Sequence, residues 1–453
     1  MSFSTHTPQQ LISEVIECTC GRTHKADGLK QIHVGRGVLP RVVTVLRELG
    51  IEKPFLLTDR NEYRAAGERV ETLLREAGIA YTLHIIPYAE DKRIPPDEFA
   101  VGSATLNFDV SCDGILCVGS GVMNDIAKIL SSVSGRPSIV VATAPSMDGY
   151  ASDTSAMEVN HVKSSLKEVI PTALVCDVDV MAQAPMRMLW AGLGDMLGKF
   201  SALREWQLAT MLNNEHYCAE TAELVKNSLA KIVSGADGVP SRDPDSVEQI
   251  TNGLLLSGIA MAYTGQSRPA SGLDHYFSHC WEMMALERGE ESDLHGIQVG
   301  VGVLLTLRIY EHLRELHPTM EGVHAAIASF DPAAWEANLR RVLGSIADDM
   351  VEMERTAQKN EPTGRLRRAQ IAIENWDRVL YIAEHDAPTA DELEALMKRI
   401  GMPTRPCEIG ISDQDVIDAF VCSRDVRNKF QLSSMIWDIG CMDEVAEWLR
   451  GIL

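Results

Sequence analysis

Three histidines in one short stretch of the sequence have the spacing of a metal site. His275 and His279 are four residues apart on a predicted helix, and His295 opens the next helical segment. Residues four apart share a helix face, and neutral imidazole is the commonest metal ligand in proteins. Two histidines with a carboxylate form a typical open catalytic site. The cluster therefore favours metal binding over three unrelated structural histidines.

A carboxylate and an ammonium share a predicted helix face upstream. Asp195 and Lys199 lie four residues apart, in a segment that also contains Gly192 and Gly194. Each glycine lowers helix stability by about 1 kcal/mol relative to alanine, so the pair suggests close approach by a ligand or another backbone. The alternative is an ion pair on an exposed face, which the apolar flanking residues disfavour.

A glycine-containing turn joins a buried apolar run to a predicted helix. The turn is Gly119-Ser120-Gly121, followed by Asn124 and Asp125. Such turns let a ligand approach the backbone, and the N–H groups at the helix start attract phosphate. Because Asn124 stands where the dinucleotide motif has its last glycine, a turn without a ligand is an equally open interpretation.

Two aspartates end or follow predicted strands. Asp59 ends an apolar run, where an acid can bind a ribose 2′-hydroxyl and disfavour a 2′-phosphate; a helix N-cap is the alternative. Asp148 follows another run, after Thr143 and Ser146, where open α/β sheets bind ligands. A plain turn before Gly149 is the alternative for Asp148.

The elements that must position these residues change character along the chain. In the first third, short apolar runs alternate with helical periodicity, which predicts βαβ units and a parallel sheet. The predicted strands are Gln31–Val34, Pro54–Asp59, Ala80–Ile86, Gly114–Val118 and Ser138–Thr143.

From Pro185 onward, strand signals disappear and helical periodicity dominates. We predict an α/β domain over residues 1–180 and an all-helical domain over 181–453. The predicted helical segments are Met186–Met211, Ala219–Ser234, Ser246–Tyr263, His275–Leu286, His295–Leu316, Arg365–Ala383 and Asp391–Arg399.

Composition excludes several classes of protein. With 42 Lys and Arg against 64 Asp and Glu, the formal charge of −22 argues against broad nucleic-acid binding. No apolar run has the length of a membrane span, and the first residues lack the features of a signal peptide. The cysteines, mostly single and in apolar contexts, indicate reduced thiols in a cytoplasm. Cys18-Thr-Cys20-Gly-Arg-Thr-His24 is half of a zinc pattern, but without an obvious fourth ligand a plain turn is favoured.

In their order along the chain, these motifs resemble those of the glycerol dehydrogenases, metal-dependent alcohol dehydrogenases and dehydroquinate synthases. The segments Pro145–Ser152, Gly194–Trp206 and Ser271–His279 most resemble the bacterial sn-glycerol-1-phosphate dehydrogenases. The resemblance implies a Rossmann-like α/β domain followed by an all-α domain, NAD(H) or NADP(H) as cofactor, and one divalent Zn, Ni or Fe ion.

The resemblance also assigns roles to residues. It implies Asp195, His275 and His295 as metal ligands, and Gly119, Ser120, Gly121 and Asp125 with Asp59 as the cofactor side. Thr143, Ser146 and Asp148 match the nicotinamide and substrate side, and Asp148 or a water chain through His279 would relay a proton. Iron-type relatives have a ligand histidine where this chain has Lys199, so Lys199 and Lys163 are candidate phosphate contacts.

The implied activity is hydride transfer between nicotinamide and dihydroxyacetone phosphate or sn-glycerol 1-phosphate. A polyol dehydrogenase acting on an unphosphorylated substrate is the first alternative, and the two lysines argue against it. A dehydroquinate-synthase-like cyclase is the second, and the Asp195–Lys199 spacing argues against it. We expect a homo-oligomer without nucleic-acid or membrane partners.

Overall fold

A computed structural model describes residues 2–89, 93–159 and 162–453, and the chain falls into two compact units. Unit 1 comprises Met1–Met196 and Ala219–Gln266, and unit 2 comprises Leu197–Cys218 and Ser267–Leu453. Neither unit is one continuous stretch. The predicted boundary near residue 180 therefore marks where the secondary structure changes from strands and helices to helices alone. It does not separate the two compact units.

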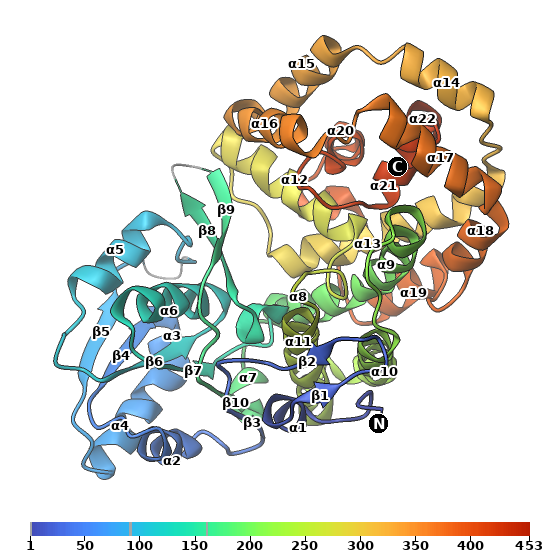
Figure 1. Ribbon diagram of the computed structural model, residues 1–453. Helices are drawn as coiled ribbons and strands as arrows, with labels where there is room; N and C mark the ends of the chain where they lie inside the picture. The colour runs from blue at the N-terminus through green and yellow to red at the C-terminus, as the bar shows by residue number, and fades with distance from the viewer. Residues whose placement is uncertain (1, 90–92, 160–161) are drawn as a thin grey trace. The chain divides into compact units, whose positions relative to one another are not determined.

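Unit 1 is built on a six-stranded parallel sheet (Figure 1). Five of its strands lie where the sequence predicts them. The sixth, β10, was not predicted, because it follows the hairpin of β8 (Thr154–Val159) and β9 (Val162–Lys167) rather than a helix. The strand order is β3 (Gln31–Gly35), β10 (Ala173–Asp177), β7 (Ser138–Ala142), β6 (Gly114–Gly119), β4 (Pro54–Asp59) and β5 (Thr82–Ile86).

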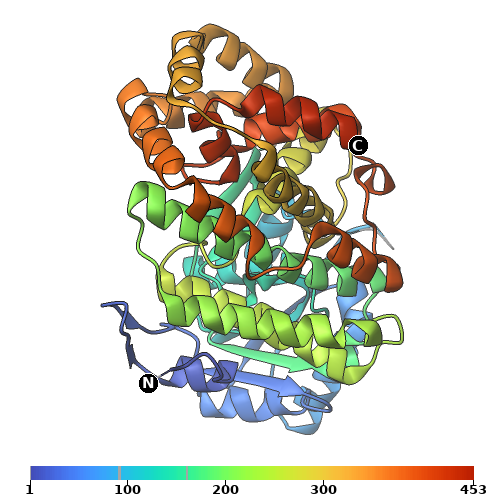
Figure 2. The same cartoon turned by 90° about the vertical axis from the view of Figure 1, so that its right-hand side faces the viewer.

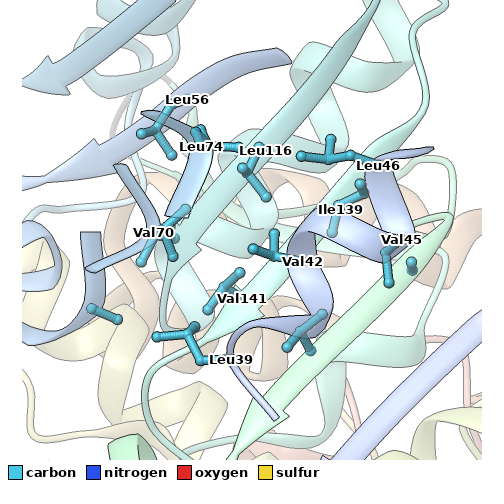
Figure 3. Close-up of a cluster of buried hydrophobic side chains, with 14 of the residues drawn as sticks. Leu39, Val42, Val45, Leu46, Leu56, Val70, Leu74, Leu116, Ile139 and Val141 are labelled. Atoms are coloured by element: carbon cyan, nitrogen blue, oxygen red, sulfur yellow. The ribbon is translucent and has the colours of Figure 1, made fainter. Parts of the chain in front are cut away.

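Helices α2 (Arg41–Glu48) and α4 (Glu68–Glu76) pack on one face of this sheet (Figure 3). Leu116 and Val118, two residues apart in β6, both point to that face, as the period-two geometry of a strand requires. Burying a side chain of this kind contributes about 1.5–3 kcal/mol relative to leaving it exposed. This core fixes the strands whose carboxyl ends carry the predicted cofactor residues.

At two glycines of unit 1, the backbone of one segment lies directly against the backbone of another. A Cβ on Gly192 would lie 1.7 Å from the Pro145 carbonyl oxygen, and one on Gly258 would lie 3.0 Å from the Asp148 carbonyl oxygen. The close backbone approach expected at Gly192 is therefore confirmed. Other helices and strands that lie wholly or mostly in unit 1 are α1 (Pro8–Ser13), β1 (Ile16–Glu17), β2 (Thr23–His24), α6 (Gly121–Ser134), η2 (Asp148–Ala151), α8 (Met186–Leu197), α10 (Ala219–Gly235) and α11 (Pro244–Thr264).

Unit 2 consists of helices and loops. The prediction of one helix over Met186–Met211 is wrong, because the chain breaks at Gly198 between α8 and α9. The segment Arg365–Ala383 is likewise two helices, which meet at Asn375. The main helices are α9 (Lys199–Asn213), α12 (Leu273–Arg288), α13 (His295–His312), α14 (Met320–Ala328), α15 (Pro332–Leu343), α16 (Ala347–Ala357), α17 (Pro362–Glu374), α18 (Trp376–Glu384), α19 (Ala390–Arg399), α20 (Asp413–Ser423), α21 (Leu432–Asp438) and α22 (Met442–Ile452).

Among the described residues, none of these helices combines the length and apolar character that crossing a membrane requires.

Candidate active site

The carboxyl ends of three neighbouring strands bring the predicted cofactor residues to one edge of the sheet. Asp59 ends β4, Gly119 ends β6 and Thr143 directly follows β7. The register pairs Thr58 with Val118 and Gly119 with Ala142, and the Thr143 N–H donates to the Gly119 carbonyl at 3.3 Å. Parallel sheets bind ligands at this edge.

The turn after β6 presents backbone N–H groups at the start of α6. Ser120 is the N-cap residue of that helix, and its side chain makes no capping hydrogen bond. Glu62, which sequence reasoning missed, accepts the Ser120 N–H at 3.2 Å. Burial raises the pKa of Glu62, and the neighbouring Asp59 carboxylate raises it further. A buried acid therefore lies where a phosphate is expected.

Asp59 also caps the short helix α3 (Arg60–Glu62), accepting the Glu62 N–H at 2.8 Å. The N-cap alternative is thus present in the structure, and ribose binding by Asp59 stays a prediction. Burial raises the pKa of this carboxyl.

Three other predicted residues have different surroundings. Asp125 forms an ion pair with the buried Lys128 at 2.9 Å and accepts the Ala156 N–H at 3.1 Å, which links α6 to β8. Ser146 is half-buried in the loop after β7. The side chain of Lys163 lies outside the described part of the chain.

Asp148 and Asp195, predicted separately, are direct neighbours in unit 1. The Asp148 N–H donates to Oδ2 of Asp195 at 2.9 Å, and the Ser257 hydroxyl donates to Oδ2 of Asp148 at 2.8 Å. Asp195 is 1% exposed. The loop after β7 therefore orients the carboxylate of α8, and α11 orients that of Asp148.

In unit 2, the first histidine of α12 is held by its preceding residue. Nδ1 of His275 lies 2.5 Å from Oδ2 of the buried Asp274, which also accepts a hydrogen bond from Ser201. A Cβ on Gly198 would lie 2.4 Å from Asp274 Oδ2, so only glycine fits at the helix break. A carboxylate on one ring nitrogen fixes the orientation of a ligand histidine and leaves the other nitrogen for the metal.

The other two histidines share a carboxylate that the sequence analysis missed. Glu282 lies 3.4 Å from Nδ1 of His279 and 3.4 Å from Nδ1 of His295. The ligand atoms of these three residues all lie within 4.8 Å of one another. His295 also lies beside His275, with ring centroids 5.4 Å apart. Glu282 is three residues after His279, so the helical period could have revealed it.

Lys199 is the first residue of α9 and is 0% exposed. The helix breaks at Gly198, between Asp195 and Lys199. The two residues therefore do not share a face of one continuous helix, as the sequence had predicted. A buried ammonium requires an anionic or hydrogen-bonding partner. A substrate phosphate and a protein carboxylate would both meet that need.

Comparison with known families identifies relatives of both sequence and fold. Residues 33–185 match a family described as iron-containing alcohol dehydrogenase. A protein of Halalkalibacterium halodurans named glycerol-1-phosphate dehydrogenase (NAD(P)+) is 33% identical over 307 residues, which cover 68% of this chain and 77% of that protein. One of Methanosarcina acetivorans with the same name is 32% identical, covering 62% of this chain and 76% of that protein.

Solved structures extend the likeness in fold to nearly the whole chain. Glycerol dehydrogenase from Schizosaccharomyces pombe has a TM-score of 0.57 at 16% identity, covering 94% of this chain and 91% of that one. Sulfoacetaldehyde reductase from Bifidobacterium kashiwanohense, solved with NAD+, has a TM-score of 0.59 at 13% identity, covering 93% and 97%. At such identities the likeness shows the fold alone, an α/β unit combined with helices.

Proposed function

The chain belongs to the glycerol-1-phosphate dehydrogenase family, within the iron-containing alcohol dehydrogenases, and we propose the following reaction for it. It is a metal-dependent NAD(P) oxidoreductase. The proposed reaction transfers a hydride from NAD(P)H to the carbonyl carbon of dihydroxyacetone phosphate, and a proton to the carbonyl oxygen, giving sn-glycerol 1-phosphate. The reverse reaction returns the hydride to NAD(P)+.

Two contacts support the proposal beyond family membership. Two residues 47 positions apart, Asp148 and Asp195, are joined by a hydrogen bond in unit 1. In unit 2, the rings of His275 and His295 meet edge-on, with centroids 5.4 Å apart. These contacts support the proposal, because each joins residues to which the resemblance assigns a role on the substrate or metal side.

We assign the metal to Asp195, His275 and His295. An oxygen and two nitrogen donors suit Zn²⁺, Ni²⁺ or Fe²⁺. The Asp274 carboxylate on Nδ1 of His275 leaves Nε2 as the ligand atom, so the donor chemistry fits a divalent ion. When bound, the ion polarises the substrate oxygen as a Lewis acid.

The protein's own side chains supply the remaining functions. Asp148, oriented by Ser257, is our candidate to hold the alcohol proton, with His279 as the alternative relay. The N–H groups of Ser120 and Gly121 are assigned to the pyrophosphate. We propose that Asp59 favours NADH over NADPH, because its carboxylate would repel a 2′-phosphate. Equal kcat/KM for the two cofactors would contradict that role.

A variant of Lys199 distinguishes a phosphorylated from an unphosphorylated substrate. If it binds phosphate, Lys199→Ala should lower kcat/KM for dihydroxyacetone phosphate by about ten- to a hundredfold, because a charge-assisted contact is lost. Activity on dihydroxyacetone should change much less. Equal losses on both substrates, with weaker metal binding, would make Lys199 a support for the ligand carboxylate and favour a polyol dehydrogenase.

The direct test is NADH oxidation with purified, metal-analysed protein over a panel of ketones and keto-phosphates. We expect the highest kcat/KM with dihydroxyacetone phosphate and a product of sn-1 configuration. A preference for unphosphorylated ketones would overturn the substrate assignment and leave the oxidoreductase class intact. The homo-oligomer and the cytoplasmic location remain predictions.

A further inference from the structure

A second group of metal-binding side chains lies at the N-terminal hairpin, far along the chain from the histidines of α12 and α13. Cys18, Cys20, His24 and Cys218 place one sulfur or nitrogen atom each within 4.8 Å of all the others. The sequence pattern had lacked a fourth ligand, and Cys218 supplies it from about 200 residues away. Cys218 is the last residue before the chain returns to unit 1, and its peptide bond to Ala219, the first residue of α10, keeps it at the start of that helix.

We propose that these four residues form a closed structural zinc site. Three thiolates and one imidazole are a typical donor set for structural Zn²⁺ in a tetrahedral arrangement. With Zn–S about 2.3 Å and Zn–N about 2.0–2.1 Å, ligand atoms in such a site lie about 3.5–3.8 Å apart. Cys20 Sγ and His24 Nε2 are already 3.4 Å apart.

The backbone around the hairpin supports this arrangement. The Cys20 N–H donates to Cys18 Sγ at 3.5 Å, which stabilises a thiolate at that sulfur. The Cys18 N–H donates to the Arg22 carbonyl, and Gly21, with φ +83°, makes the turn that returns His24 to the cysteines. A side chain at position 21 would strain this turn.

The ring of His24 is oriented as a zinc ligand requires. Its Nδ1 lies 3.0 Å from the carbonyl oxygen of Tyr263, which can only accept a hydrogen bond. Nδ1 therefore carries the proton, and the lone pair of Nε2 points to the cysteines. A carbonyl on the second ring nitrogen is the usual support of a ligand histidine. His24 and Cys218 are both 0% exposed, so water has little access to two of the four ligands.

The site would fasten the N-terminal segment to α10 and α11. Figures 1 and 2 both show this segment, in blue, beside those yellow-green helices. Phe3 packs edge-on against both His24 and Tyr263, and the Tyr263 hydroxyl donates to the Leu11 carbonyl. The hairpin itself has only two residues in each strand, too few to hold its position alone.

Metal analysis of purified, chelator-washed protein tests the proposal. Cys18→Ser and Cys218→Ser should each hold one zinc equivalent per chain less than the wild type. Cys407→Ser, at an exposed cysteine outside the cluster, should lose none. After replacement by Co²⁺, the thiolate-to-cobalt absorption should be present in the wild type and Cys407→Ser and absent in the other two. Unchanged metal content in Cys218→Ser would overturn the site.

A measurement on the unaltered chain covers the case in which a variant fails to fold. Titration with a mercurial should release one zinc equivalent as three thiols react. Release of no zinc, or a disulfide among these cysteines in protein isolated with reductant and zinc, would overturn the proposal. The difference of one zinc equivalent between the wild type and the hairpin variants does not depend on the catalytic metal. A protein that lost only the catalytic metal would still keep the hairpin zinc.

Discussion

The N-terminal hairpin and the α12–α13 pair each bring together side chains of metal-binding types, but the two clusters differ in donor atoms and in exposure. The hairpin cluster has three thiols and one imidazole, and two of its four members are completely buried. The α12–α13 cluster has only nitrogen and oxygen donors, and its His279, Glu282 and His295 side chains are 18%, 10% and 29% exposed. A closed sulfur-rich site suits structure, whereas an open site leaves a coordination position for substrate. Donor type and solvent access, rather than the presence of ligands alone, therefore distinguish the structural role proposed for the hairpin from the catalytic role proposed for α12 and α13.

The largest expected effect is on activity, at His275, a proposed ligand of the catalytic metal on α12. His275→Ala should lower kcat by a factor of about a thousand or more, because Lewis-acid stabilisation is worth several kcal/mol and each 1.4 kcal/mol is about tenfold. The melting temperature should change little. Steady-state kinetics and metal analysis check this, with Cys407→Ser as the control. Full metal content and activity in His275→Ala would show that His275 is not a ligand of the catalytic metal.

The reverse pattern is expected at the hairpin. Cys218→Ser should keep kcat at temperatures well below unfolding, while its melting temperature falls by roughly 10 °C. Binding free energy at a structural metal site is folding free energy, and each kcal/mol corresponds to about 2–4 °C for a unit of this size. Calorimetry of wild type and variant checks it. Equal melting temperatures would show that the cluster does not stabilise the fold.

A smaller effect is expected one contact away from the catalytic metal. Asp274→Asn should weaken metal binding by about ten- to a hundredfold, because Asp274 orients His275 and raises its basicity. Competition with a metal-binding dye measures the affinity. The hairpin zinc should keep its occupancy in the same sample. A loss shared by both metals would mean that the variant has unfolded rather than lost one support.

The smallest effect concerns pH and the cofactor turn. The pKa of Glu62 is raised, so the acid is neutral at low pH and becomes anionic as the pH rises through that value. An anion at the Ser120 N–H competes with a phosphate, so KM for NADH should rise several-fold with pH. Glu62→Gln should flatten the profile. A profile unchanged by this substitution would assign the pH dependence to another group.

Much of the fold follows from local pattern, whereas much of the site does not. The apolar runs of β3, β4, β5, β6 and β7 predicted five strands of the sheet, and the helical period of α10 to α13 predicted those helices. β10 was missed because no helix separates it from the preceding hairpin. The break at Gly198 was missed because a glycine inside a helical period is commonly tolerated.

The missed site residues differ in how far the sequence could have indicated them. Glu282 lies within one helical turn of His279 and was accessible to periodicity. Asp274 precedes His275 but acts through a geometry that only the helix start creates. Cys218 and Glu62 are brought to their partners by tertiary folding across long separations, and a single sequence contains no local signal for such pairs.

The attachment of the hairpin to α10 and α11 has a consequence for synthesis on the ribosome. Residues 18–24 leave the exit tunnel early, but Cys218 and the Tyr263 carbonyl follow only after about 200–240 further residues. At roughly 5–20 residues per second, the N-terminal segment waits about 10–50 s for its partners. Its cysteines are exposed to oxidation and to competing metals during that interval, so completion of unit 1 depends on the redox state and zinc supply that the nascent chain meets.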